Sequence, residues 1–413
     1  MTTMDFPYLL DKLLSAEVRT LLSQLVSVAE RSGQPLYLVG GTVRDMLLGQ
    51  PPGDLDLVVE GDVPALAREA AKEVGGQVLA HSQFGTATLK LGDIRIDLAT
   101  ARTETYARPG ALPQVRAGTL QDDLVRRDFT INAMAVALSG VDRGLLVDPF
   151  GGQHDLKDGL VRVLHDRSFV DDPTRILRGI RYEQRLGFRF EEGTLHLLQE
   201  ALDRRCLSTV TGDRLRHELE KMLEEPEPLK PLLRARELGV FAGLYPALRD
   251  APYLSKLEDM RVDDPLVYLA VLAYGLDPRY RAGFVFRLNM PLRWEKVVND
   301  TLTLRSMEPD LADAEMSPLE LCHKLDPLSE ASLQAALLVM DDGPAKANLA
   351  RYVNELRYVN PLLNGDDLLL LGIPEGPMIG EALEMLRLAR LEGRARTRRD
   401  EVALVREFVS RSA

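Results

Sequence analysis

The sequence has few cysteines and no long apolar run. Its two cysteines, Cys206 and Cys322, stand far apart and outside any metal-type spacing, so they predict neither a disulfide framework nor a metal site. No segment approaches the roughly 18 consecutive apolar residues that a membrane span needs. The N-terminus also lacks a basic start followed by an apolar signal core. We therefore expect a cytoplasmic protein.

An excess of positive charge is also missing. The 413 residues include 51 Lys and Arg against 63 Asp and Glu, a net charge of −12, which argues against a protein that coats nucleic acid nonspecifically. A local basic stripe is still present near the C-terminus. It is either a solvated helix end with charge pairs or a surface for nucleic-acid phosphates. Its members are Arg387, Arg390, Arg394, Arg396, Arg398 and Arg399.

The order of sequence patterns divides the chain into an α+β part and a longer helical part. Between residues 36 and 150, short apolar runs alternate with glycines and predict strands, joined by helices at residues 63–74 and about 120–136. Beyond residue 150 strand signals almost vanish, and apolar residues recur at helical spacing. Soft breaks at 224–228, 263–265 and 341–346 predict a compact unit at 1–150 and helical pieces at 151–225, 226–345 and 346–413. The strand segments are 36–41, 54–60, 76–81, 86–92, 94–100 and 145–152.

Two aspartates stand two residues apart in the run GDLDLVV. Asp54 and Asp56 would project from one face of a strand, and like charges so close are usually avoided unless a cation lies between them. Asp97, in IRIDLAT, falls on the polar face of a second predicted strand. Three carboxylates on adjacent strands suit two Mg²⁺ ions. A solvated strand face is the alternative explanation.

A pair of glycines precedes the two acids by about a dozen residues. Gly40 and Gly41 follow the apolar run LYLV and precede a predicted helix at residues 42–49. Backbone N–H groups can approach an anion closely in such a turn, and Arg44 adds a fixed cation. A turn of this kind is common without function, but a phosphate cradle so close to a metal-type acid pair is uncommon.

Four ordered motifs resemble those of the class II tRNA nucleotidyltransferases, the CCA-adding enzymes, which are related to bacterial poly(A) polymerases in the polymerase-β-like superfamily. They are GGTVRDMLLGQPPGDLDLVV from residue 40, RRDFTINAMAV from 126, VDPFGG from 147 and DDPTRILRGIRYEQRLGF from 171. The segment from Asn364 to Glu401 also resembles long bacterial members. The resemblance implies a nucleotidyltransferase head with a small mixed or antiparallel sheet at 1–150. A helical neck at 151–225 with a nucleotide-template helix, a helical body at 226–345 and a tRNA-binding tail at 346–413 would follow.

The resemblance also implies a role for each candidate residue. Asp54 and Asp56 would be catalytic acids that bind Mg²⁺, with Asp97 as the third carboxylate. The template motif opens Asp171-Asp172 where the family usually has Glu-Asp, which puts only the supporting contact of the first acid in doubt. The implied nucleotide-binding residues are Gly40, Gly41, Arg44, Arg127, Asp128, Asp172, Arg175, Arg178 and Arg181, and the implied RNA-binding residues are Arg394, Arg396, Arg398 and Arg399.

Asp172 and Arg175 offer a physical basis for base selection, because side chains three apart at a helix start can converge on one ligand. Cytosine and adenine both present an amino donor beside an unprotonated ring nitrogen, which suits a carboxylate and a guanidinium. Uracil and guanine would leave both contacts mismatched, at roughly 1–3 kcal/mol each. On the segment alone, a helix cap with a surface ion pair is the simpler explanation. Likewise, residues 126–128 could be a charged turn, and Arg178 and Arg181 solvated helix charges.

The reaction that follows from the resemblance is nucleotidyl transfer, in which the RNA 3′-hydroxyl attacks the α-phosphorus of CTP or ATP and pyrophosphate leaves. Complete CCA addition is the first choice, addition of only the terminal A or only CC the second, and poly(A) synthesis the third. Segment 100–124 is not evidently short, which argues against CC-only addition, and the acidic charge balance argues against poly(A) synthesis. An inactive RNA-binding homologue would predict a degraded acid set, whereas Asp54, Asp56 and Asp97 all remain.

Overall fold

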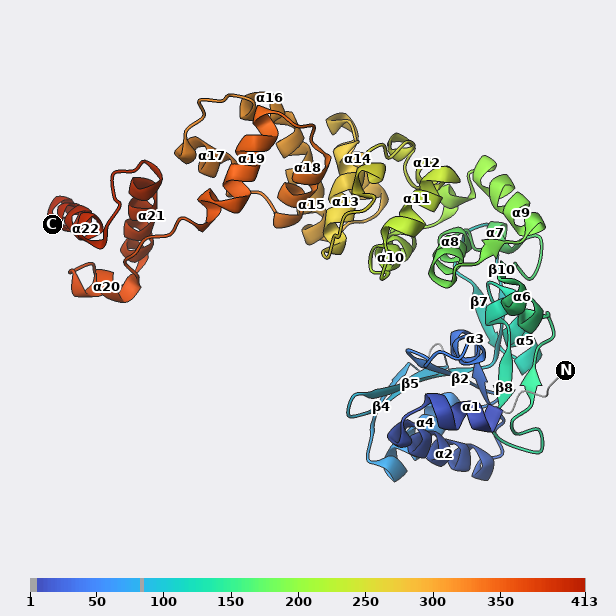
Figure 1. The fold of residues 1–413 in the computed structure, drawn as a ribbon. Helices are drawn as coiled ribbons and strands as arrows, with labels where there is room; N and C mark the ends of the chain where they lie inside the picture. Colours follow the sequence, from blue (N-terminus) through green and yellow to red (C-terminus); the bar gives the residue numbers. More distant parts are fainter. Residues whose placement is uncertain (1–5, 82–84, 413) are drawn as a thin grey trace. The chain divides into compact units, whose positions relative to one another are not determined.

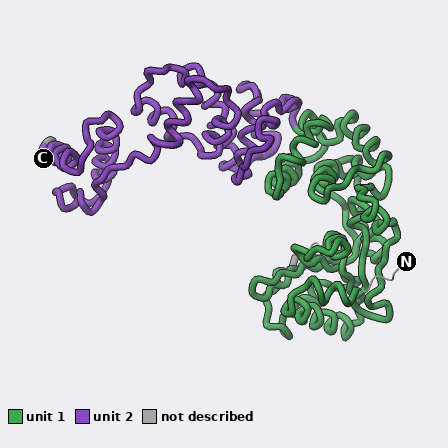
Figure 2. Tube along the Cα trace, viewed as in Figure 1, with its two compact units in different colours: residues 1–244 green, residues 245–413 purple. Residues whose placement is uncertain are grey.

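The computed structural model describes residues 6–81 and 85–412 and divides into two compact units, residues 1–244 and 245–413 (Figure 2). All strands found among the described residues lie in the first unit, and the second is helical. This confirms the predicted α+β part followed by helices. The finer division into four domains stays a prediction.

A seven-stranded mixed sheet forms the core of the N-terminal part (Figure 1). Its strand order is β3-β4-β5-β2-β1-β8-β9, and β2 and β5 are its parallel neighbours. The strands are β1 Leu36–Val39, β2 Leu55–Val59, β3 Gln77–His81, β4 Thr86–Leu91, β5 Ile94–Thr100, β8 Ala135–Ala137 and β9 Leu146–Val147. Each of the six predicted strand segments contains a strand, so these predictions are confirmed.

Alternation along the strands sets which face of the sheet is buried. On β5, Ile96 and Leu98 are buried, whereas Asp97 between them points to the opposite face. Helix α4 (Val63–Val74) packs on β3, β4 and β5 and against α2 (Ala16–Arg31). Asp62 accepts a hydrogen bond from the Ala65 N–H and caps the start of α4. Helices cover the apolar face, so the polar face of the sheet is available to the pocket described below.

The predicted helix at residues 63–74 is confirmed, but the one predicted near 120–136 is wrong beyond residue 125. A capping box at Thr119 begins α5 (Leu120–Val125). The chain then forms the 3₁₀-helix η2 (Thr130–Asn132) and strand β8, where Val136 pairs with Leu38 of β1. Strand pairing and complete burial of this apolar run outweigh its helical spacing.

The rest of the first unit is mainly helical and centres on α8 (Thr174–Leu186), which packs against α10 (Gly212–Leu223) and α11 (Leu229–Glu237). A Cβ atom at Gly179 of α8 would lie 2.8 Å from Phe190 and 2.9 Å from Phe129, so only glycine fits there. The other elements are α1 Phe6–Leu13, α3 Gly41–Leu47, β6 Arg102–Thr105, β7 Gln114–Ala117, α6 Gly152–Asp158, β10 Leu160–Val161, α7 Ser168–Asp171, β11 Arg189–Phe190, α9 Glu192–Asp203, η3 Cys206–Thr209 and α12 Val240–Leu244.

The second unit is built around α13 (Pro265–Tyr274), which is buried all round and packs on α15 and α18. Its last three helices enclose a small core of their own that includes Leu368, Leu386 and Val405. None of the helices in the described part of the chain is long and apolar enough to cross a membrane. The remaining elements are η4 Pro246–Leu248, η5 Leu254–Leu257, η6 Pro278–Tyr280, α14 Arg281–Arg287, α15 Leu292–Ser306, α16 Glu308–Leu311, α17 Pro318–Leu325, α18 Glu330–Val339, α19 Pro344–Asn354, η7 Leu356–Tyr358, α20 Gly365–Leu370, α21 Pro377–Leu391 and α22 Arg398–Ser412.

Candidate active site

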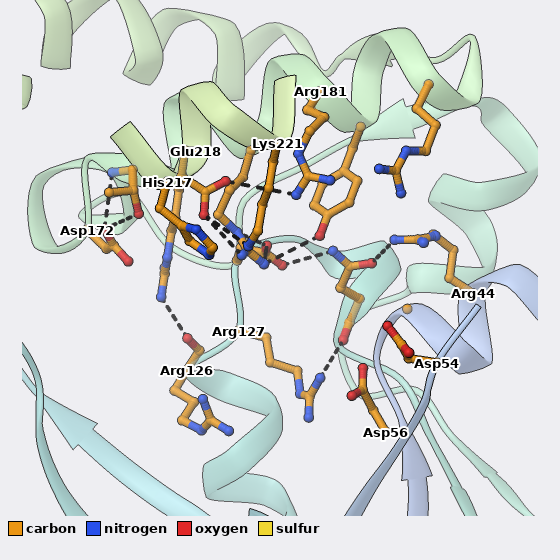
Figure 3. Close-up of a pocket in the computed structure, with 18 of the residues that line it drawn as sticks. Arg44, Asp54, Asp56, Arg126, Arg127, Asp172, Arg181, His217, Glu218 and Lys221 are labelled. Carbon is orange, nitrogen blue, oxygen red and sulfur yellow. Dashed lines mark hydrogen bonds and ion pairs between the residues drawn. The ribbon is translucent and has the colours of Figure 1, made fainter. Parts of the chain in front are cut away.

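A pocket of about 910 Å³ in the first unit gathers most of the predicted site residues. Figure 3 shows Asp54 and Asp56 close together at one end of the pocket and Asp172 at the other. Arginines from four segments line the pocket. The predicted residues that line this pocket are Gly41, Arg44, Asp54, Asp56, Arg127, Asp128, Asp172, Arg175, Arg178 and Arg181.

The glycine turn is tied directly to the acid pair. Gly40 has a φ of +69°, and a Cβ there would lie 2.5 Å from Nη1 of Arg127, so a side chain at this position would displace the arginine. The hydroxyl of Thr42, two residues after Gly40, donates to the Asp54 carbonyl and accepts from the Asp56 N–H, both at 3.0 Å. The sequence analysis missed Thr42. Its two bonds fix the acids relative to the turn.

Arg44 is buried at the edge of the pocket and is held on two sides. Its Nη1 donates to Oδ1 of Asn132 at 2.6 Å, and its Nε donates to Asp45 at 2.8 Å. The predicted helix at 42–49 is confirmed as the short α3, so Arg44 projects from a fixed backbone. The arrangement leaves a preorganised cation near the two aspartates.

Asp54 lies just before β2, and Asp56 lies on it. Asp56 faces the open pocket but is crowded by protein, and this desolvation raises its pKa. Arg127 partly offsets the effect, whereas Asp97 and Asp54 add to it. Carboxylates that crowd one another in this way favour a bound cation, and hard oxygen ligands suit a divalent ion. The donor set therefore fits the predicted metal site.

Asp97 lies beside Asp56 but outside the main pocket. The two are register partners on the parallel strands β2 and β5, and Thr88 is the next residue across, on β4. The Asp97 carboxylate accepts a 2.5 Å hydrogen bond from Thr88 and pairs with Arg95 at 2.8 Å. It lines a second pocket of about 360 Å³, which also contacts Asp56. Within residues 6–81 and 85–412, no group of three or more His, Cys, Asp or Glu side chains is arranged to hold a metal ion, so the role of Asp97 as a third ligand stays a prediction.

Arg126 and Arg127 share one carboxylate that the sequence analysis missed. Both donate to Asp123 of α5, which is completely buried, at 2.5 and 2.8 Å. Burial alone would raise the pKa of Asp123, but the two arginines hold it below its ordinary value. The 126–128 segment is thus a fixed part of the pocket wall and not a solvated turn.

Asp128 is also buried, and protein donors reach both of its oxygens. Oδ1 accepts hydrogen bonds from the Phe129 N–H and from Asn132, and Oδ2 accepts two from Arg178. Burial would raise the pKa of Asp128, yet Arg178 and Asn132 hold it far below its ordinary value. The predicted contact of Asp128 with a ribose stays a prediction.

Asp172 precedes α8 by two residues and caps it, as the alternative interpretation predicted. Its Oδ1 accepts from the N–H and hydroxyl of Thr174 and from Nη2 of Arg214, at 3.1, 2.6 and 2.7 Å. No hydrogen bond joins a described residue to Oδ2. Arg175 does not form the surface ion pair of that interpretation: it is 4% exposed and donates to the Ser168 hydroxyl and the Arg126 carbonyl, each at 2.7 Å. Both residues line the pocket.

Helix α10 contributes a pocket wall that the sequence analysis also missed. Arg214, His217, Glu218 and Lys221 recur at helical spacing and therefore share one face, which lines the pocket (Figure 3). That spacing was visible in DRLRHELEK. Asp171, the departure from the family motif, pairs with Arg167 at 2.9 Å.

The C-terminal arginines form charge pairs, but not the pairs four residues apart on one helix that the solvated-helix alternative predicted. Arg398 pairs with Asp367 and Arg394 with Glu392, while all four RNA-binding candidates are exposed. A phosphate group could compete for such exposed pairs because each is weak. RNA binding by Arg394, Arg396, Arg398 and Arg399 stays a prediction.

Comparisons with known proteins agree with this geometry. Residues 36–162 match the family model described as the poly A polymerase head domain, and residues 187–251 match the one described as a probable RNA and SrmB-binding site of polymerase A. An A-adding tRNA nucleotidyltransferase of Halalkalibacterium halodurans is 38% identical over 94% of this chain and 92% of its own length. Another from Geobacter sulfurreducens is 36% identical over 96% of this chain, although the match covers 48% of that protein.

Solved structures show the same likeness. A CCA-adding enzyme in an apo form is 35% identical over 99% of both chains, with a TM-score of 0.78. The CCA-adding enzyme of Thermotoga maritima in complex with tRNA is 33% identical over 98% of this chain and 99% of its own, with a TM-score of 0.75. This chain belongs to the family of the tRNA nucleotidyltransferases and bacterial poly(A) polymerases, because it is 38% identical to a member along nearly its whole length, matches two family models and contains the four motifs.

Proposed function

We propose that this enzyme adds C and A, or one of them, to the 3′ end of tRNA from CTP and ATP without a nucleic-acid template. The observation that supports this proposal is the pocket itself. It joins two carboxylates suited to a metal, a wall of arginines and an Asp–Arg pair suited to a base. Since tRNA is the proposed substrate, we also propose a cytoplasmic location.

The triphosphate would lie along the arginine wall, where Arg44 and Arg127 flank the glycine turn. Asp54 and Asp56 would hold the divalent ions, for which we propose Mg²⁺, and these would stabilise charge on the attacking and leaving oxygens. The chain itself orients the α-phosphorus by fixing Arg44 through Asn132 and the acids through Thr42. Such preorganised positioning is the main contribution that a protein makes to phosphoryl-type transfer.

The base would lie at the other end of the pocket. Asp172 offers Oδ2 as an acceptor for an exocyclic amino group, because its Oδ1 is already bound by Thr174 and Arg214. Arg175 would donate to the ring nitrogen after a small shift of its guanidinium from the Ser168 hydroxyl. Adenine and cytosine satisfy both contacts, whereas guanine and uracil satisfy neither.

Addition of the terminal A alone is a second candidate, and the relatives favour it. Three A-adding enzymes are 36–38% identical to this chain over 85% or more of its length. A CC-adding and a CCA-adding enzyme, matched over similar lengths, are each 29% identical, whereas two solved structures of CCA-adding enzymes are 35% and 33% identical. Shared ancestry with the A-adding group supports this narrower specificity.

The decisive experiment offers the purified protein tRNA transcripts that end before CCA, after C and after CC, each with labelled CTP or ATP and Mg²⁺. Incorporation on all three supports CCA addition, and incorporation of A only on the CC-ended transcript supports the A-specialist. No incorporation on any transcript would refute the proposed function.

A variant pair tests the metal assignment in the same assay. Asp56→Asn should lower incorporation at least about a thousandfold, because the site loses several kcal/mol of charge stabilisation. Asp93→Asn, an exposed acid in the turn between β4 and β5, should retain full activity. Equal activity of the two variants would contradict the assignment of Asp56.

A further inference from the structure

Tyr182 of α8 lies where three arginines of the pocket converge. The guanidinium carbons of Arg181, Arg44 and Arg178 are 5.0, 5.1 and 5.9 Å from the centroid of its ring. All four residues line the pocket, and Tyr182 is 9% exposed. A cation within about 6 Å of an aromatic ring is attracted to it, and more strongly when the site is desolvated.

The ring holds these cations differently from a carboxylate. A carboxylate occupies N–H donors and cancels charge, whereas an aromatic face attracts the guanidinium and leaves the N–H groups at its edge available. Each arginine already has at least one acidic partner, and further acids would repel an anionic ligand. The closest pairs are Arg44–Asp45, Arg178–Asp128 and Arg181–Glu225, and Glu218 lies 3.7 Å from Arg178 and 3.9 Å from Arg181.

The ring itself is fixed in place. Phe129 presents its edge to Tyr182, with centroids 5.9 Å apart and planes at 86°, an arrangement that aromatic pairs prefer. The Tyr182 hydroxyl accepts a long hydrogen bond of 3.4 Å from Arg178. Arg181 has a buried Nε atom without a hydrogen-bond partner, so the ring face is an important part of what holds this side chain.

We propose that Tyr182 is a positioning residue that holds Arg44, Arg178 and Arg181 together for the triphosphate of the incoming nucleotide. The inference rests on the proposed function of the pocket. Three like charges repel one another in a buried site. The attraction of each guanidinium to the neutral ring keeps the three arginines close together without adding negative charge. The ring acts through the arginines and does not itself touch the substrate.

Direct binding measurements test this role without any need for turnover. Affinities for ATP, inorganic tripolyphosphate and adenosine are measured by calorimetry in the presence of Mg²⁺. Tyr182→Met should weaken ATP and tripolyphosphate about tenfold, as expected for the loss of cation–π attraction, and leave adenosine within twofold. Tyr182→Phe keeps the ring and should stay within twofold for all three. Tyr268→Met, which removes a buried tyrosine of the second unit, should change none of them.

Fluorinated phenylalanines at position 182 provide a second series, because they keep the shape of the ring and weaken its attraction for cations. Tripolyphosphate affinity should fall with each added fluorine. Unchanged tripolyphosphate binding in Tyr182→Met and in this series would overturn the proposal, and so would an equal loss of adenosine binding. If Tyr182→Met weakens tripolyphosphate binding as expected but the wild type modifies no tRNA, the proposed function fails while the role of Tyr182 stands.

Discussion

The guanidinium of Arg178 donates two hydrogen bonds, 2.8 and 2.6 Å long, to the same oxygen of Asp128. This pair joins α8 to a segment 50 residues earlier in the chain. Both partners line the pocket, so the ion pair contributes to the fold and to the shape of the site. Asp128 is buried but Arg178 is 30% exposed, so loss of either partner should cost about 1–3 kcal/mol, as for a hydrogen bond to a charged group.

The low pKa of Asp128 predicts a pH-dependent contribution to stability. A carboxyl group whose folded pKa is depressed stabilises the fold above its unfolded pKa, about 3.9, and loses this contribution as the pH falls through the folded value. Asp128→Asn should therefore lower the free energy of opening that hydrogen exchange reports for α8 at pH 7, by about 2 kcal/mol. The gap to the wild type should narrow below about pH 4. A gap that stays constant in acid would contradict the assigned charge pair.

Gly40 and Gly49 form a matched pair for testing the glycine turn. Both have positive φ, +69° and +74°, but a Cβ would meet Arg127 only at Gly40 and nothing at Gly49. Gly49→Ala should reduce stability by about 1–2 kcal/mol through backbone strain, and Gly40→Ala by more, because the ψ of Gly40, −133°, lies outside the left-handed helical region. Only Gly40→Ala should also raise the KM for the nucleotide, about tenfold, because it displaces Arg127. Similar KM values for the two variants would remove Arg127 from triphosphate binding.

Arg214 predicts an effect on base selection. It holds Oδ1 of Asp172, and without it the carboxylate can rotate and present either oxygen to a base. Arg214→Met should therefore reduce discrimination against UTP and GTP about tenfold, which corresponds to one weakened polar contact. Arg216→Met on the same helix, whose arginine pairs with Asp213 and does not line the pocket, is the control. Misincorporation of UTP and GTP is measured in competition assays. Equal fidelity of the two variants would count against the role of Arg214.

Asp97 predicts a change in rate with little change in nucleotide binding. As the register partner of Asp56, it lies outside the main pocket and lines the second pocket, which Arg126 and Arg127 also line. Asp97→Asn should lower kcat at least about a hundredfold and change the KM for the nucleotide less than threefold. Arg95→Gln removes the ion pair of Asp97 and should have a small effect, since Arg95 is exposed. A normal single-turnover rate in Asp97→Asn would exclude a third catalytic carboxylate.

The local pattern of apolar and polar residues was sufficient to predict the parts of the fold that depend on residues close together in the chain. The alternation in IRIDLAT gave β5 and the polar face of Asp97, and the capped run at 63–74 gave α4. It failed at residues 126–136, because β8 forms by pairing with β1 and β9. The spacing of apolar residues within one segment does not show whether a strand about a hundred residues away will pair with it.

The same reason explains which site residues the sequence missed. Family motifs supplied most of the predicted residues of the main pocket, but Arg214 pairs with Asp172 over 42 positions. Asp123 is different, because its partners Arg126 and Arg127 are only three and four residues away and that spacing was visible in the sequence. Tyr182 stands in the template motif as an ordinary apolar position of α8. Arg178 and Arg181 lie on the same helix, but the contact of Tyr182 with Arg44 of α3 depends on the folded structure.

The hydrogen bond from Arg175 to the Arg126 carbonyl bears on attempts to redesign this enzyme. One arginine of the base-reading pair is anchored on the backbone of the segment that carries Arg127. A substitution chosen to accept a new base at position 175 will also release that segment. Selections for altered nucleotide preference should therefore recover compensating changes around residues 123–127, and libraries that vary only the base-reading pair should yield slow enzymes.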